Sequence, residues 1–465
     1  RCRLLIGAAI FCSLMPSASA AERHDGLDDT FFPSGFPPIV LSQSISIPDL
    51  VTPANDLPNE ITPNEITLER AFQIAEQSNR DIEQAAIAVR QSEAAVREQQ
   101  AGYQPSVSVS AGGDYSLPIS GDNEDSAGLD GGIGLSYTLL DFGRREAAVN
   151  ISSAELQVTE LELKVVRQTV RLDIATLYYE LQNAIENVRI NQAAVANSER
   201  NLRDTELREQ AGVGTRYDSL QAQTQLADDQ VNLLSAQNDQ VVAERGLAQI
   251  LGIGETIQNL AVEPIAREPN WPLSLEETVA QAYETRAELS QQRLEQTIQQ
   301  DTAKLAQAEL SPELSLSTGY SFSSSLIDTA DTINSWQDGL NISLDVEWTL
   351  YDGGVAQAQA NQANASEAIA VSEFANQQDQ IRLEVETAYL SLQSETKQIS
   401  AAEVGIVSAE EGLNLAQLRF QAGVGTQLEV LTAQSDLTNA QSTLAQATTA
   451  YNQSIVELQR AISGL

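Results

Sequence analysis

Very few side chains in this sequence are of the kinds that do covalent or metal chemistry. The single histidine, His24, lies among prolines, and the two cysteines, Cys2 and Cys12, lie within the first twenty residues. The sequence contains no nucleophile motif and no cluster of metal-ligating residues. We therefore expect no enzymatic activity, no cofactor and no metal site.

The acidic pair Asp218 and Glu429 is the strongest candidate for a chemical role. Each acid lies six positions after the first glycine of an AlaGlyValGlyThr segment, which occurs at 211–215 and again at 422–426. Carboxylates gathered at a constriction would attract cations. Alternatively, the two acids begin the helices that follow these segments, where the helix dipole stabilises a negative charge. No Lys-Ser/Thr follows the glycines, so neither segment is expected to bind phosphate.

Long helices are predicted to position these acids, because a seven-residue apolar repeat precedes each glycine segment. The two copies match at an offset of 211 residues: Ile174, Leu181, Val188, Val195 and Leu202, then Val385, Leu392, Ile399, Ile406 and Leu413. Such a repeat predicts packing in the manner of a left-handed coiled coil. Each run spans about 67 residues, or roughly 100 Å at ~1.5 Å per residue. A shorter apolar pattern returns after each turn, and the permissive glycine backbone would allow the reversal. The sequence therefore predicts two antiparallel helical hairpins built from one duplicated unit.

Two alternating stretches precede each long helix and predict four strands of about ten residues. Their alternating apolar residues run from Val107 to Ala111, from Ile133 to Leu139, from Leu314 to Phe322 and from Leu340 to Leu350. The polar residues that we expect on one shared face are Ser106, Ser108, Ser136, Ser315, Ser343, Asp345 and Glu347. A helical pattern from Thr67 to about Gln100 comes before the first pair, and a matching segment at an offset of 207 comes before the second.

The amino-terminal region predicts export from the cytoplasm. Residues 1–20 combine basic residues, a short apolar segment and AlaSerAla, as expected of a signal peptide. Residues 21–65 hold seven prolines without periodicity and are predicted to form a flexible arm. With a net charge of −39, the chain should repel nucleic acid, so no nucleic-acid partner is expected.

The predicted strands have the length of tilted strands that cross a bilayer. Four strands cannot close a barrel, and an open sheet edge cannot lie in lipid, so a membrane role would require several copies. Aromatic residues near the strand ends favour the membrane interpretation, because aromatics gather at the lipid–water interface: Tyr137, Phe142, Trp348 and Tyr351. The alternative is a small soluble sheet at the end of a coiled coil.

The order of these segments resembles the TolC-type outer membrane efflux family over residues 66–465. The resemblance rests on the duplicated order helix–strand–strand–long helix–turn–helix, on AlaGluLeuSerPro at 308–312, and on ArgPheGlnAlaGlyValGlyThr at 419–426. It implies an α+β membrane protein with one repeat at 66–270 and a second at 271–465. Three copies would form a twelve-stranded β-barrel in the outer membrane of a Gram-negative-type cell. A long α-helical coiled-coil barrel would continue from it into the periplasm.

The resemblance also implies a function as the exit duct of a tripartite efflux or type I secretion system. The expected partners are two further copies, a periplasmic adaptor protein, an inner-membrane transporter of RND, ABC or MFS type, and outer membrane lipid. Adaptor docking would fall on the two turns, at Gly212, Val213, Gly214, Thr215, Gly423, Val424, Gly425 and Thr426.

The resemblance makes Asp218, Glu429 and Phe420 candidates for the gate at these turns. A tyrosine and an arginine that latch some members of the family closed fall on Phe420 and Gly425, which departs from the family's polar latch. We expect Phe420 to close the tip by packing, and the two tips to differ, since its counterpart is Glu209.

Two alternatives remain beside the duct. A periplasmic adaptor would contain a single helical hairpin flanked by other domains, whereas this sequence predicts two hairpins and paired strands. A structural exported coiled coil would form no barrel and would dissolve without detergent.

Overall fold

The computed structural model describes residues 66–117, 126–253, 262–327 and 336–463. The chain divides into two compact units, residues 1–61 and 62–465, and every described residue belongs to the second. The predicted signal peptide at 1–20 and the predicted arm at 21–65 lie outside the described residues.

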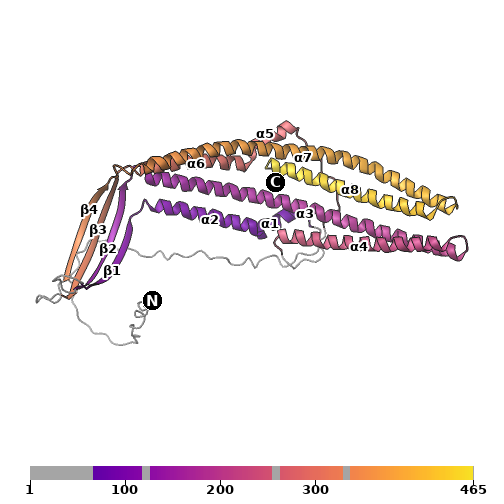
Figure 1. Ribbon diagram of the computed structural model, residues 1–465, viewed down its shortest axis with the longest axis horizontal. Helices are drawn as coiled ribbons and strands as arrows, with labels where there is room; N and C mark the ends of the chain where they lie inside the picture. The colour runs from indigo at the N-terminus through magenta and orange to yellow at the C-terminus, as the bar shows by residue number, and fades with distance from the viewer. Residues whose placement is uncertain (1–65, 118–125, 254–261, 328–335, 464–465) are drawn as a thin grey trace, which may run out of the picture. The chain divides into compact units, whose positions relative to one another are not determined.

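The second unit contains the same order of elements twice (Figure 1). The first copy comprises α1 (Leu68–Ser78), α2 (Arg80–Ala101), β1 (Ser106–Ser116), β2 (Ser126–Leu140), α3 (Arg144–Gln210) and α4 (Arg216–Ile250). The second comprises α5 (Leu275–Thr285), α6 (Ala287–Ala308), β3 (Glu313–Ile327), β4 (Trp336–Glu347), α7 (Val355–Gln421) and α8 (Gln427–Ala461). Helices α3 and α7 each have 67 residues, as the heptad pattern predicted. The duplicated fold is thus confirmed.

The first helical segment of each repeat is broken, which the sequence pattern did not predict. Asn79 is extended between α1 and α2, where its side chain accepts the N–H groups of Asp81 and Ile82 and thereby caps α2. Its counterpart Arg286 is extended between α5 and α6 but has no side-chain capping bond. The single expected helix from 67 to about 100 is therefore two helices.

The four strands form one antiparallel sheet in the order β1-β2-β3-β4. Ser136 lies opposite Ser106 on β1 and Ser317 on β3, and Ser317 lies opposite Ser343 on β4. Since directly opposed residues share a face, the predicted polar residues all lie on one face. The other face exposes apolar side chains such as Val109 and Ile342. The strands have 11 to 15 residues and are longer than predicted.

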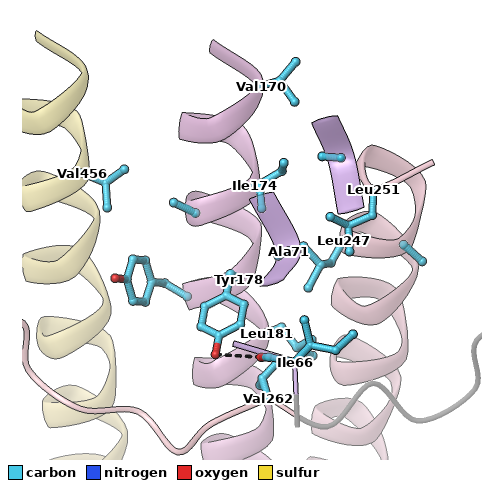
Figure 2. Close-up of a cluster of buried hydrophobic side chains, with 14 of the residues drawn as sticks. Ile66, Ala71, Val170, Ile174, Tyr178, Leu181, Leu247, Leu251, Val262 and Val456 are labelled. Carbon is cyan, nitrogen blue, oxygen red and sulfur yellow. Dashed lines mark hydrogen bonds between the residues drawn. The ribbon is translucent and has the colours of Figure 1, made fainter. Parts of the chain in front are cut away.

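Helix α3 packs against α2, α4, α6 and α8, and so joins the two repeats. Midway along α3, Ile174, Leu181 and Val188 of the predicted heptad seam are buried. A core cluster surrounds this region, where Tyr178 Oη donates to the carbonyl of Ile66 at 3.1 Å (Figure 2). Val456 of α8 belongs to the same cluster, so residues from both repeats share one core.

The joints between sheet and long helices have a common design. Asp141 accepts the backbone N–H of Arg145 at 3.0 Å, and Asp352 accepts that of Ala356 at 2.6 Å. Each carboxylate thus stabilises the start of a 67-residue helix. These are the aspartates of the ThrLeuLeuAspPheGly and ThrLeuTyrAspGlyGly segments, which explains why both segments contain an acid at that position.

Candidate functional site at the helix tips

The two glycines of each turn serve different purposes. Gly212 and Gly423 have φ of +73° and +75°, a left-handed conformation that glycine adopts without strain. Gly214 does not have a positive φ, but a Cβ there would lie 3.0 Å from Arg208 Cβ and 3.1 Å from the backbone nitrogen of Glu209. Only the first glycine therefore supplies the permissive backbone, while the second allows close approach to the preceding helix.

The acids Asp218 and Glu429 lie in the first turns of α4 and α8, as the helix-start alternative predicted. Thr215 and Asp218 form a capping box, in which the carboxylate accepts the Thr215 N–H at 3.1 Å. Thr426 accepts the N–H of Glu429, whose carboxylate instead lies 3.4 Å from Arg419 Nε. Both carboxylates thus have a partner within their own tip. That they face a lumen stays a prediction.

The two tips lie against each other, and both turns line an open pocket of about 280 Å³ between them. The Arg208 guanidinium of repeat 1 lies over the Phe420 ring of repeat 2, at 4.4 Å from the ring centre. Arg208 Nη1 also donates to the Phe420 carbonyl at 3.3 Å. Sequence reasoning found Phe420 but missed Arg208, because the two residues stand 212 positions apart.

The tips are not equivalent, in agreement with the sequence comparison of Phe420 and Glu209. Glu209 pairs with Arg216 at 3.5 Å, whereas Phe420 contacts Arg208. Gln427, at the start of α8, is only 2% exposed, and its amide has no hydrogen-bond partner in the described part of the chain. The sequence contained no signal for this buried amide, because its counterpart is Arg216.

The two turns expose small side chains. Val213 and Val424 are exposed between their glycines, and Thr215 and Thr426 are exposed at the helix starts. A surface of this kind, with exposed apolar groups and accessible backbone, suits contact with another protein.

The predicted interface aromatics gather at the end of the sheet where the long helices begin. Phe142, Trp348 and Tyr351 are exposed, whereas Tyr137 is half-buried. Trp348 Nε1 donates to the Leu310 carbonyl at 3.0 Å, which ties the residue after β4 to the turn after α6.

Arg145 is a further residue of this junction that the sequence interpretation missed. It pairs with Asp141 at 2.7 Å, donates to the carbonyls of Gly102 and Thr138, and lies over the ring of Tyr103. The side chain thereby joins α3 to the loop after α2 and to the end of β2.

Among the described residues, no group of three or more His, Cys, Asp or Glu side chains could hold a metal ion. Within the same residues, no helix combines the length and apolar character needed to cross a membrane.

The family model for outer membrane efflux proteins matches residues 71–253 and 278–464, one stretch in each copy of the duplicated unit. The chain belongs to the outer membrane efflux protein family. The outer membrane protein TolC of Vibrio cholerae is 24% identical over 342 residues, which cover 72% of this chain and 77% of that protein. The pyoverdine export outer membrane protein OpmQ of Pseudomonas aeruginosa is 25% identical over 347 residues, or 74% and 71% of the two chains.

Solved structures show the same fold. A crystal structure of CusC superposes with a TM-score of 0.73 at 21% identity, covering 86% of this chain and 92% of that one. The outer membrane protein VceC of Vibrio cholerae gives 0.70 at 21% identity, covering 85% and 96%. Outer membrane efflux proteins are channel proteins, and the family therefore places this chain among transport proteins.

Proposed function

We propose that three copies of this chain form an exit duct from an inner-membrane pump across the periplasm and the outer membrane. The observation that carries the proposal is the four-stranded sheet with one polar face and one exposed apolar face. Its edge strands β1 and β4 have no further strand partner among the described residues. Unpaired edges are costly in lipid, and three copies would pair all of them in a twelve-stranded barrel. The polar face would then line a water-filled lumen.

The long helices α3 and α7, with their returning partners α4 and α8, would extend this lumen through the periplasm. At ~1.5 Å per residue, 67 residues give a helix of about 100 Å. The tips would meet a periplasmic adaptor through Val213, Val424 and the surrounding turn backbone. The adaptor would in turn recruit an inner-membrane transporter, which would select the substrate.

Efflux by living cells tests this function. Cells that lack the chain should accumulate a dye that the matching pump exports, and expression of the chain should restore its export. Mass measurement of the purified protein in detergent should give a trimer. A monomer under these conditions would contradict the architecture, and undiminished export without the chain would contradict the function.

A further inference from the structure

One carboxylate stands on the otherwise apolar face of the sheet. Asp338 of β4 lies two residues before Leu340 and four before Ile342, so the alternation of a strand puts all three on that face. All three side chains are exposed. Among the described strand residues, no other charged side chain lies on this face, because the other acids, such as Asp130 and Asp345, belong to the polar face. A lone acid in this place needs a physical reason, since a charge that faces lipid is destabilising away from the interface.

Tyr320 of β3 fixes the position of this carboxylate. Its Oη donates to Asp338 Oδ2 at 3.0 Å, diagonally across the two strands. Both side chains remain exposed, Tyr320 at 47%. An ionised carboxylate has about four acceptor positions on its two oxygens, and the bond from Tyr320 uses only one of them. Asp338 is therefore an oriented acceptor that donors from outside the chain can reach.

An aromatic platform lies beside the carboxylate. The rings of Phe322 and Trp336 stack, with centres 5.9 Å apart and an angle of 30° between their planes. Trp336 precedes Asp338 by two residues, and Phe322 lies opposite Asp338 on β3. Gly131 of β2 makes room for the Phe322 ring, because a Cβ there would lie 2.6 Å from its Cζ. Trp336 is 64% exposed, so its ring is accessible to a ligand.

These four residues, Tyr320, Phe322, Trp336 and Asp338, form what we call the aromatic–acid patch. The patch lies toward the end of the sheet that points away from the long helices (Figure 1). Strand β4 runs from the patch to the start of α7, so the patch and the helices are at its opposite ends. In the duct proposed above, this end reaches the outer surface of the outer membrane, and the apolar face contacts lipid.

We propose that the aromatic–acid patch binds the neutral sugar headgroup of a glycolipid in the outer leaflet. In this arrangement the C–H face of a sugar ring packs on the Trp336 ring, and sugar hydroxyls donate to Asp338. The inference rests on the proposed function, because only a sheet in the outer membrane meets such a lipid. It adds a ligand on the outside of the barrel to a protein whose proposed transport runs through the inside.

Charge favours a neutral sugar over a phosphorylated headgroup. The four strands contain no lysine and no arginine, so the described sheet offers no cation to a phosphate. Asp338 would repel a phosphate directly. Hydroxyl groups, in contrast, are donors that a carboxylate accepts in short, charge-assisted hydrogen bonds. Aromatic side chains alone suit any lipid–water interface, but a fixed carboxylate beside them discriminates among headgroups.

Native mass spectrometry of the detergent-purified trimer tests this ligand. The trimer is stripped of lipid and mixed with equal amounts of digalactosyl diacylglycerol and phosphatidylglycerol that have the same acyl chains. We expect one glycolipid to be retained per chain. The glycolipid should be preferred over phosphatidylglycerol at least about tenfold, as expected for hydrogen bonds to a charged group.

Three substitutions and one control assign this preference to the patch. Asp338→Leu removes the carboxylate and places an apolar side chain on an apolar face, so it should leave the trimer intact and reduce the preference to about one. Trp336→Leu should weaken glycolipid binding as well. Tyr320→Phe keeps the ring but removes the donor that orients Asp338, so it should lower the preference about threefold, and it should have no effect when added to Asp338→Leu. The matched control Asp130→Asn neutralises an acid of the polar face and should keep the wild-type preference.

The possible results separate this inference from its alternatives. Equal retention of the two lipids by the wild type would show that the patch is an ordinary aromatic belt. An unchanged preference in Asp338→Leu would place the headgroup elsewhere. A preference for phosphatidylglycerol that a chelator abolishes would mean that Asp338 holds a divalent cation that bridges to phosphate. Each of these results overturns the sugar ligand, but a trimer that supports efflux would leave the proposed function intact. A monomer in detergent would overturn both.

Discussion

Replacement of Phe420 by leucine would isolate the contact between the two helix tips. The wild-type ring lies 4.4 Å from the Arg208 guanidinium, and Arg208 also donates to the backbone carbonyl of residue 420. Leucine keeps an apolar side chain and keeps the carbonyl, so the hydrogen bond can survive. The substitution removes the attraction between cation and ring. Phe420→Tyr is the matched control, because it keeps the aromatic ring.

The size of the effect follows from the number of contacts. A cation–ring contact at a half-exposed site contributes about 0.5–1 kcal/mol. Three copies in a trimer would together contribute roughly 1.5–3 kcal/mol to the closed tip. Because about 1.4 kcal/mol corresponds to a tenfold change in an equilibrium constant, Phe420→Leu should raise the ratio of open to closed channels about 10- to 100-fold. Phe420→Ala should have a larger effect, since it also removes apolar contact.

Two measurements check this expectation. In planar bilayers, Phe420→Leu should increase the fraction of time that the channel conducts, while Phe420→Tyr should match the wild type. In intact cells, Phe420→Leu should increase sensitivity to a bulky antibiotic that the outer membrane normally excludes. Arg208→Ala should open the channel more than Phe420→Leu, because it also removes the hydrogen bond to the carbonyl of residue 420. Adding Phe420→Leu to Arg208→Ala should change little further, because the contact with the ring is already lost. If Phe420→Leu conducts as the wild type does, the ring is ordinary helix packing and does not hold the tip closed.

Three further predictions concern docking, ion selectivity and stability. Val424→Asp places a charge on the exposed tip, so it should prevent adaptor docking and abolish export. The detergent trimer and its thermal midpoint should stay unchanged, and persistent export would argue against docking at this turn. The pair Asp218→Asn and Glu429→Gln should abolish most of the cation preference, measured as reversal potential under a salt gradient, and an unchanged potential would assign selectivity elsewhere. Asp218→Asn should itself cost at most about 1 kcal/mol, since the asparagine amide oxygen can still accept the Thr215 N–H. Arg286→Met removes one of the two arginines that pair with Glu288 and Glu384, so it should reduce stability by roughly 1.5–3 kcal/mol at neutral pH. Burial alone would raise the pKa of Glu288, but Arg286 and Arg460 outweigh it and hold that pKa below its usual value. A carboxylate whose pKa is lowered in the folded state stabilises the fold above its unfolded pKa of about 4.3, and this contribution is lost as the pH falls through the folded pKa. The difference in melting midpoint between Arg286→Met and wild type, measured by circular dichroism, should therefore shrink below about pH 4. An equal difference at neutral and acid pH would show that the ion pairs are not its cause.

The sequence predicted the long helices and the strands because their signals are local. Heptads within 144–210 and 355–421 specify helix length and the buried seam, and alternation specifies which strand face is polar. The breaks at Asn79 and Arg286 were missed because neither position carries proline or glycine. The extended backbone at Asn79 is supported by a side-chain bond to the carbonyl of Ile250, which lies 171 residues away. Such a partner is set by tertiary packing, and no local pattern contains it.

The tip was only partly predictable for the same reason. Comparison of the repeats identified Phe420 as a departure, because Glu209 occupies the matching position. It could not identify Arg208, because the ring and the guanidinium come from opposite repeats. The capping box at Thr215 and Asp218 was within reach of the sequence, since an acid three residues after a threonine is its local signal.

The most informative differences between the repeats concern where each copy places its charges. In repeat 2, Arg286 is 2% exposed and pairs with Glu288 and Glu384, and Arg460 pairs with the same two acids. In repeat 1, the counterparts of the two arginines are Asn79 and Gln249, and no such network forms.

Repeat 1 instead carries Arg80 and Arg245 on its outer surface, where repeat 2 has the buried residues Ala287 and Val456. The exchange follows burial within the protomer: Ala287 and Val456 are covered, whereas the matching positions of repeat 1 are exposed and carry charge. Charged side chains keep their hydration at exposed positions and would lose it at buried ones. The divergence of the two repeats thus reflects which helix faces are interior to the protomer.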